Sequence, residues 1–253
     1  MPGAVVLTFD NLGEASELER GTWTGEHPLG RHPSVTVALP RLLAVLERHG
    51  LRATFFVEAI NCALNPGAVA TIAEAGHELA AHGWRHESWA TLEPEREPEL
   101  LQRGRIAYRE LGLQPRGFRP PGGRVGPRTL ERIRAAGFDW CSPEIGTVRA
   151  PDGPALVPFE WAEVDAYHLM DAFAQLRAER GDGSATAGAA QTAGRIRAAL
   201  DGEPPAGSAH VLVLHPFLML DPAWAEQVES LLAELARGRD QGLCCLTAGE
   251  AAS

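Results

Sequence analysis

The stretch VVLTFD at residues 5–10 is a short apolar run that ends on a carboxylate, Asp10. Three later apolar runs also end on reactive side chains, at His82, Arg119 and His215. Reactive groups gathered at the C-terminal ends of several parallel strands are the layout of a β/α barrel enzyme. The sequence therefore predicts a barrel whose chemistry lies at one end of its strands.

A repeating order of amphipathic helix, glycine and apolar run continues along the chain. A glycine after a helix supplies the left-handed position that turns the chain into the next strand. Strands that alternate with helices favour parallel pairing and an α/β fold. The 253 residues are therefore predicted to form one domain, 1–253. The closing glycines are Gly50, Gly76, Gly112, Gly137 and Gly242, and the runs that follow them lie at 52–57, 77–81, up to 118, 138–141 and 243–246.

One segment interrupts this order. Residues 179–209 are rich in Gly, Ala, Ser and Pro, with GDGS at 181–184 and EPPAG at 203–207. We interpret them as flexible loops around one helix at 192–200. Because the apolar run that ends on His215 lies beyond them, they are predicted to be a surface insertion or lid inside the domain.

Bulk properties limit the partners of the chain. A net charge of −10 and a pI near 5.4 argue against nucleic acid and anionic membranes. No apolar run approaches the roughly 20 residues of a membrane span, and the start, MPGA, has no basic region of a signal peptide. The four cysteines form no C-x-x-C pair. These features predict a cytoplasmic protein with a small-molecule substrate.

The stretch HGWRH places His82 and His86 four residues apart, directly after an apolar run. Neutral imidazole is a common metal ligand and proton carrier. An isolated H-x-x-x-H pair is a weak signal, because surface and core histidines also produce it. The other strand ends, with their aspartate, arginine and histidine, favour the functional interpretation.

The order of these motifs resembles the polysaccharide deacetylase family, carbohydrate esterase family 4, over about residues 4–250. The motifs are TFD at 8–10, GHE at 76–78, HGWRH at 82–86, FRPPG at 118–122 and LHP at 214–216. LVPFEW at 156–161, followed by Asp165, resembles more closely an intracellular branch with peptidoglycan-deacetylase-like proteins, metal-independent allantoinase and cyclic imide hydrolases. The resemblance implies a distorted (β/α)7-type barrel that hydrolyses a carbon–nitrogen bond.

The resemblance also implies roles for individual residues. Asp10 matches the general base, Arg119 the arginine that orients it, and His215 the histidine that protonates the leaving group. His82 and His86 match the two metal-binding histidines.

Substrate contacts are less strongly indicated. Asp165 lies near the site in the related branch, and Trp84 and Trp161 are candidates for an aromatic wall, with core packing as the alternative. Arg124 is a candidate substrate anchor.

Asn11 departs from the family pattern, which has an aspartate there as the third metal ligand. A catalytic zinc site usually has three protein ligands, and an asparagine offers only a neutral oxygen. Either zinc or another divalent metal binds more weakly, or a second carboxylate replaces the aspartate, or the site works without metal. Glu14, Glu78 and Glu87 are the candidate replacements.

The predicted reaction is attack of water on an amide carbonyl. Asp10 takes the proton, and Arg119 keeps that carboxylate ionised. A metal would polarise the carbonyl; without one, His82 and His86 would donate hydrogen bonds to the oxyanion. His215 then protonates the departing nitrogen.

Three functions remain open from the sequence. The first is hydrolysis of a small N-acetylated sugar or a cyclic amide or imide in the cytoplasm. The alternatives are an exported polysaccharide or peptidoglycan deacetylase, and a catalytically inactive binding module, which the asparagine at position 11 motivates. A homo-oligomer also remains open, since the resembling branch includes oligomers.

Overall fold

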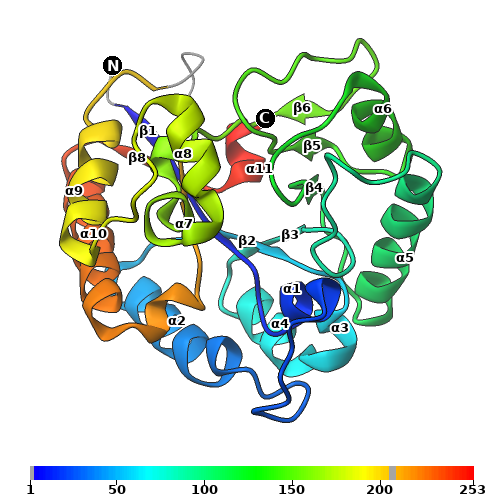
Figure 1. Cartoon of the computed structure of the whole chain (residues 1–253), viewed down its shortest axis with the longest axis horizontal. Coiled ribbons are helices and arrows are strands. Elements are labelled where there is room, and N and C mark those ends of the chain that lie inside the picture. Colours follow the sequence, from blue (N-terminus) through cyan, green and yellow to red (C-terminus); the bar gives the residue numbers. More distant parts are fainter. Residues whose placement is uncertain (1–2, 205–208) are drawn as a thin grey trace.

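A curled sheet of parallel strands forms the centre of the protein, and helices surround it (Figure 1). The computed structural model describes residues 3–204 and 209–253. The strand order is β6-β5-β4-β3-β2-β1-β7, and β8 pairs with β1 beside the start of that strand. The strands are β1 (Ala4–Asp10), β2 (Thr54–Val57), β3 (Glu78–Ala81), β4 (Gly117–Phe118), β5 (Trp140–Cys141), β6 (Ala155–Leu156), β7 (His210–Leu214) and β8 (Cys244–Leu246).

The outer ring consists of amphipathic helices that follow the strands in sequence (Figure 1). In the described part of the chain β6 and β7 are not paired with each other, and Val164, which follows β6 in the sequence, forms one isolated parallel bridge with Val213 of β7. This confirms the predicted distorted (β/α)7-type barrel. The helices are α1 (Ala15–Arg20), α2 (Leu39–His49), α3 (Asn61–Leu64), α4 (Pro66–Glu74), α5 (Arg96–Glu110), α6 (Pro127–Ala135), α7 (Asp165–Leu169), α8 (Ala174–Arg180), α9 (Ala189–Leu200), α10 (Pro222–Asp240) and α11 (Ala248–Ala251).

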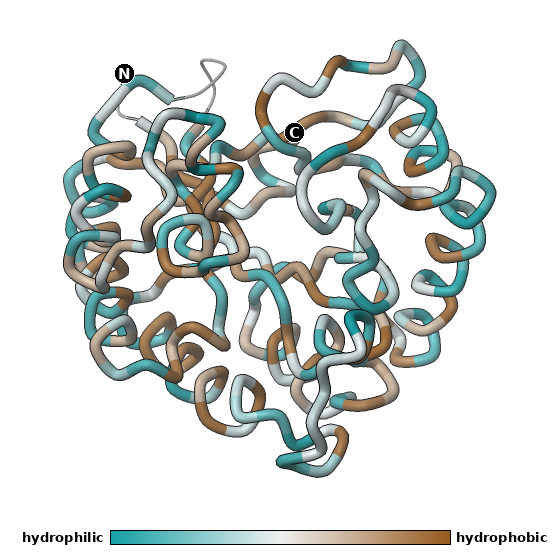
Figure 2. The backbone as a smooth tube through the Cα atoms, in the orientation of Figure 1, coloured by the Kyte–Doolittle hydropathy of each residue, from teal (hydrophilic) through white to brown (hydrophobic). Residues whose placement is uncertain are grey.

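Alternation along β1 decides which side chains reach the interior. Val5, Leu7 and Phe9 pack outward in the core beneath the helices, whereas Val6 packs in the core inside the barrel. Because successive side chains of a strand point to opposite faces, Asp10 shares the inner face with Val6. In Figure 2 the helices around the sheet alternate between hydrophobic and hydrophilic residues along their turns.

Helix α9 lies within the predicted insertion at 179–209. Its Ala193 and Ile196 are fully buried in the core shared with α10, and Arg197 donates to Glu234 on that helix at 2.8 Å. This helix therefore packs as part of the outer ring. Much of the loop predicted at 203–207 lies outside the described residues.

Two smaller findings concern the cysteines and the apolar character of the helices. All four cysteines are free, and Cys244 is exposed rather than buried. Among residues 3–204 and 209–253, no helix has the length and apolar character that crossing a bilayer requires.

Candidate active site

A cavity of about 470 Å³ opens at the C-terminal ends of the strands. One part of its wall is polar and the other is apolar. The polar part contains Asp10, Asn11, His82, His86, Arg119 and His215, and the apolar part contains Phe159, Trp161, Val164, Met170, Phe173 and Phe217. The structure thus brings together Asp10, Asn11, His82, His86, Arg119 and His215, which the sequence predicted for catalysis and metal binding.

Asp10 and Arg119 form a buried ion pair at the base of this cavity. Arg119 Nη1 donates to Asp10 Oδ1 at 2.7 Å and to Thr8 Oγ1 at 2.9 Å, and Nη2 donates to Ser142 Oγ at 2.8 Å. The guanidinium carbon lies 3.9 Å from the centre of the Phe56 ring. These contacts fix one oxygen of Asp10 and leave Oδ2 directed toward His82, 3.9 Å from Nε2.

His82 has a defined tautomer. Its Nδ1 lies 2.8 Å from the backbone oxygen of Arg119, and a carbonyl oxygen can only accept, so Nδ1 carries the proton. Burial lowers the pKa of His82 to about 3, and the charge of Arg119 acts in the same direction. The ring is therefore neutral, and the Nε2 lone pair remains available beside Asp10.

Asn11 and His86 share an unusual backbone conformation. They are the non-glycine residues of the described chain with positive φ, at 62° and 72°. Residues in this region cost free energy and cluster at functional sites. Asn11 Oδ1 is buried without a hydrogen-bond partner, and burial lowers the pKa of His86 well below its usual value. The side-chain oxygen of Asn11 and one ring nitrogen of the neutral His86 are thus acceptors at the cavity.

Glu58 is a buried carboxylate of this site that the sequence analysis missed. It follows β2 directly and is fully buried. One of its oxygens and one nitrogen each of His82 and His86 lie within 4.8 Å of one another. Burial raises the pKa of Glu58 to about 8. The three residues form a donor set suited to a divalent cation, since a Glu and two His residues hold catalytic zinc in other enzymes.

The three carboxylates that the sequence suggested as replacements for the aspartate have other partners. Glu14 accepts from the backbone of Gly30, and Glu87 accepts from Trp84 N and Arg85 N. Glu78 accepts from Thr54 Oγ1 and Gly249 N at the opposite end of the strands. The carboxylate beside the two histidines is therefore Glu58.

His215 is held by Asp165 on the other side of the cavity. His215 Nδ1 donates to Asp165 Oδ1 at 2.5 Å, and the backbone N of His215 donates to Oδ2 at 2.9 Å. Burial alone would lower the pKa of His215, but the charge and the hydrogen bond of Asp165 outweigh it and raise the pKa. The pair therefore favours a protonated His215.

The predicted substrate contacts are only partly in position. Trp161 lines the cavity, and its Nε1 donates to Glu144. Trp84 instead packs under Arg103, whose guanidinium carbon lies 3.8 Å from the ring centre. Arg124 pairs with Glu144 outside the cavity lining. Asp165 is fully buried and is hydrogen-bonded to His215, and it is not among the residues that line the cavity.

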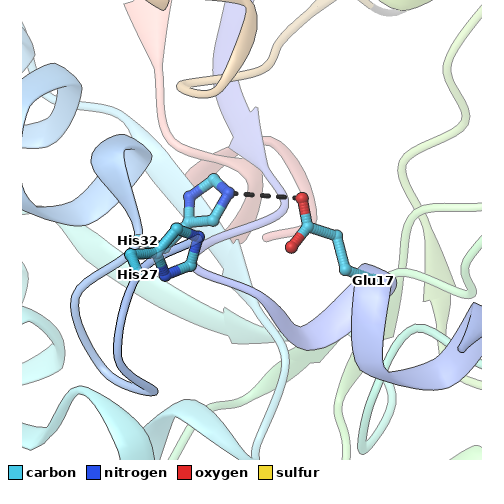
Figure 3. Close-up of side chains that lie close together, drawn as sticks. All are labelled: Glu17, His27 and His32. Carbon is cyan, nitrogen blue, oxygen red and sulfur yellow. Dashed lines mark ion pairs between the residues drawn. The ribbon is translucent and has the colours of Figure 1, made fainter. Parts of the chain in front are cut away.

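A second group of possible ligands consists of Glu17, His27 and His32 (Figure 3), none of which is among the residues that line the cavity. His32 Nδ1 accepts from Ser34 N at 3.1 Å, so its Nε2 carries the proton and faces Glu17 Oε1 at 3.5 Å. A metal would need that nitrogen as a lone pair. We therefore interpret the contact as an ordinary polar contact between His32 and Glu17 rather than as a metal site.

Gly83 shapes the loop between the two cavity histidines. Its φ is 76°, and an added Cβ would lie 2.8 Å from Glu87 Oε2. We expect Gly83→Ala to lower the free energy of unfolding by about 1–2 kcal/mol from the backbone conformation alone. Urea unfolding measures the change.

Gly194→Ala is the matched control for this substitution. Gly194 lies inside α9 with open space around it, and alanine there should add about 0.5–1 kcal/mol. Equal stability of Gly83→Ala and the wild-type protein would contradict the role assigned to Gly83.

Comparison with known proteins places the chain in a family. The sequence profile of polysaccharide deacetylase matches residues 2–141, more than half of the chain. The chain therefore belongs to the polysaccharide deacetylase family, a class of hydrolases that act on carbon–nitrogen bonds other than peptide bonds. This confirms the resemblance to the polysaccharide deacetylase family.

Individual relatives cover different parts of the chain. The peptidoglycan-N-acetylglucosamine deacetylase PgdA of Listeria monocytogenes is 33% identical over 110 residues, 43% of this chain and 23% of that protein. The chain thus matches about a quarter of that relative's length. A structure of a candidate polysaccharide deacetylase from Mycobacterium smegmatis superposes with a TM-score of 0.76 at 27% identity, covering 97% of this chain and 93% of its own. The allantoinase Puue shares the fold, with a TM-score of 0.72 at 18% identity over 99% of this chain and 89% of its own.

Proposed function

We propose that this protein hydrolyses an amide carbon–nitrogen bond with Asp10 as general base and His215 as general acid. The observation that carries this proposal is the pairing of each group with its own buried partner. Arg119 holds Asp10, and Asp165 holds His215, on the wall of a single cavity. Environments that separate the protonation states of two groups are typical of an acid and base pair.

The proposed reaction begins with a water molecule between Asp10 and the amide carbonyl. Asp10 Oδ2 removes a proton as the water oxygen bonds to the carbonyl carbon. His215 then donates its Nε2 proton to the amide nitrogen as the carbon–nitrogen bond breaks. The products are a carboxylic acid and an amine, so water supplies every atom that is added.

The side chains near Asp10 fit a divalent cation, for which zinc is our first choice. The neutral His82 and His86 would hold it, together with oxygen donors around Asn11. When bound, such a metal supplies a Lewis acid for the carbonyl oxygen. Arg119 orients the base whether or not a metal is present.

The proposed substrate is a small amide, either an N-acetylated amino sugar or a cyclic amide or imide. A volume of about 470 Å³ is in the range of small-molecule sites. Phe159, Trp161 and Phe173 give one side an aromatic surface, which suits the apolar face of a ring. The free cysteines support a reducing compartment, in keeping with a cytoplasmic metabolite.

Asp165 acts in this proposal as the residue that positions His215 and keeps it protonated. Hydrolysis should decline as the pH rises through the raised pKa of His215, because the general acid is then lost. Asp165→Asn removes the charge that raises this pKa. We expect the alkaline limb of the kcat profile to move to lower pH in that variant.

The control for the pH profile is Asp171→Asn, which changes an exposed aspartate near α8. Its profile should overlay that of the wild-type protein. An unchanged alkaline limb in Asp165→Asn would show that His215 is not the acid that limits the rate.

A panel of amides tests the proposed function. The purified protein is assayed with N-acetylglucosamine, N-acetylglucosamine oligomers, allantoin and simple cyclic imides, each with and without added zinc. Turnover of a monomeric amide is the expected result. Turnover of the oligomers alone would favour the second candidate, a polysaccharide or peptidoglycan deacetylase, which the named activity of the Listeria relative supports. No turnover on any substrate would favour a binding module and contradict the proposal.

A further inference from the structure

We propose that Glu58 is the third protein ligand of a divalent metal in this site, in place of the carboxylate that Asn11 lacks. The inference rests on the proposed function, since it names the metal site of the same cavity. It moves the anionic ligand from the end of β1 to the end of β2. Glu58, His82 and His86 then form a set of two neutral imidazoles and one carboxylate.

The first support is that several buried acceptors at this end of the barrel have no hydrogen-bond donor. Glu58 Oε1 and Asn11 Oδ1 are buried without hydrogen-bond partners. The Nε2 lone pair of His82 faces another acceptor, Asp10 Oδ2, at 3.9 Å. An unsatisfied buried polar atom costs about 1–3 kcal/mol, and more when it is charged. A cation satisfies such acceptors together, whereas a single proton satisfies one of them.

The second support is the way the Glu58 carboxylate is held. Its Oε2 accepts from Leu12 N at 3.1 Å and from Asn61 Nδ2 at 3.3 Å. Asn61 Nδ2 also donates to the backbone oxygen of Leu12 at 2.9 Å. One oxygen is therefore fixed by neighbours that also hold the residue after Asn11, while the other oxygen stays free. Partners of this kind orient metal ligands in known sites.

The third support is charge. Replacing the family's aspartate by Asn11 removes one negative charge from the cation site. A cation that displaces the proton of Glu58 restores this charge from the adjacent strand. Glu58 directly follows β2, which pairs with β1 up to Asp10. The group Glu17, His27 and His32 also has one carboxylate. Its His32 is unsuited to a metal, because Ser34 N holds that ring in the tautomer whose Nε2 carries a proton.

Metal binding to the full chain tests the inference without reference to activity. Protein stripped with a chelator is titrated with zinc by calorimetry and with cobalt(II) by visible absorption. We expect Glu58→Gln to weaken zinc binding by more than about 100-fold, since losing even an outer-shell partner costs 10–100-fold. Glu14→Gln, a buried carboxylate outside the group, is the matched control and should bind zinc as the wild-type protein does.

A rescue experiment separates ligand loss from misfolding. Asn11→Asp returns the family's carboxylate, so the double variant Asn11→Asp with Glu58→Gln should regain most of the zinc affinity and the cobalt absorption. Asn11→Asp alone should bind at least as tightly as the wild-type protein. Equal zinc affinity of Glu58→Gln and wild type, or a wild-type protein that binds no metal, would overturn the inference.

The test of Glu58 as a metal ligand and the test of the proposed hydrolase function give results that can be told apart. Amide turnover by a protein that binds no metal would refute the assignment of Glu58 and leave the hydrolase proposal standing. Zinc binding that depends on Glu58 in a protein without turnover would support the site and refute the hydrolase.

Discussion

Asp10→Asn is expected to lower kcat for amide hydrolysis by about 10²–10⁴-fold, the usual contribution of a general base. Asparagine keeps an oxygen that accepts from Arg119 but cannot take a proton from water. Because the other side chains of the cavity wall are unchanged in this variant, KM should change little. Steady-state kinetics on the best substrate of the panel measure both constants.

The control for this variant is Asp201→Asn at the exposed end of α9, which should retain full activity. Thermal melting of both variants gives the folded fraction by which the rates are corrected. A kcat within a few-fold of wild type in Asp10→Asn would remove Asp10 from the role of base.

Arg119→Met is expected to lower the free energy of unfolding by about 3–5 kcal/mol, because it leaves the buried Asp10 carboxylate without its partner. The arginine is almost wholly buried and also donates to Thr8 and Ser142. Methionine fills much of the space beside Phe56 but makes none of these hydrogen bonds. Urea unfolding near neutral pH measures the loss.

Two further variants show whether the charge is the cause. Adding Asp10→Asn to Arg119→Met should reduce the combined loss below the sum of the two, since residues in contact are not additive. Arg116→Met changes an arginine whose side chain is 76% exposed, and its ion pair should contribute about 0–1 kcal/mol. A loss from Arg119→Met as small as that from Arg116→Met would contradict the buried pair.

The strand-end pattern in the sequence predicted much of the site for a physical reason. Parallel strands end at the same edge, so Asp10, His82, Arg119 and His215 meet at one cavity although they are far apart in the chain. The same reasoning predicted the barrel, because each glycine after a helix marks the start of the next strand.

Glu58 also lies directly after a predicted strand, so the strand-end pattern could have identified it, but the sequence analysis missed it. It follows the apolar run TFFV as Asp10 follows VVLTF, whereas the predicted replacements Glu14, Glu78 and Glu87 are close in sequence to Asn11 and the histidines. Proximity in a barrel comes from the neighbouring strand, and β2 pairs with β1 beside Asp10.

The substrate contacts could not be predicted from the sequence, because they depend on the direction in which each side chain points. Nothing in the sequence distinguishes Trp161, which lines the cavity, from Trp84, which packs beneath Arg103. The burial of Asp165 under His215 likewise depends on where α7 begins relative to β7. Such directions follow from loop geometry, which periodicity does not encode.

The central claim is that water, activated by Asp10, attacks an amide carbonyl in this cavity. It is tested most directly by a single turnover, with protein in excess over the best amide of the panel, in water enriched in the heavy oxygen isotope. Mass spectrometry of the released acid should show one oxygen from water with the wild-type protein, and Asp10→Asn should release almost no acid. An unlabelled acid from the wild-type protein would show attack by an oxygen of the enzyme, and would contradict the account.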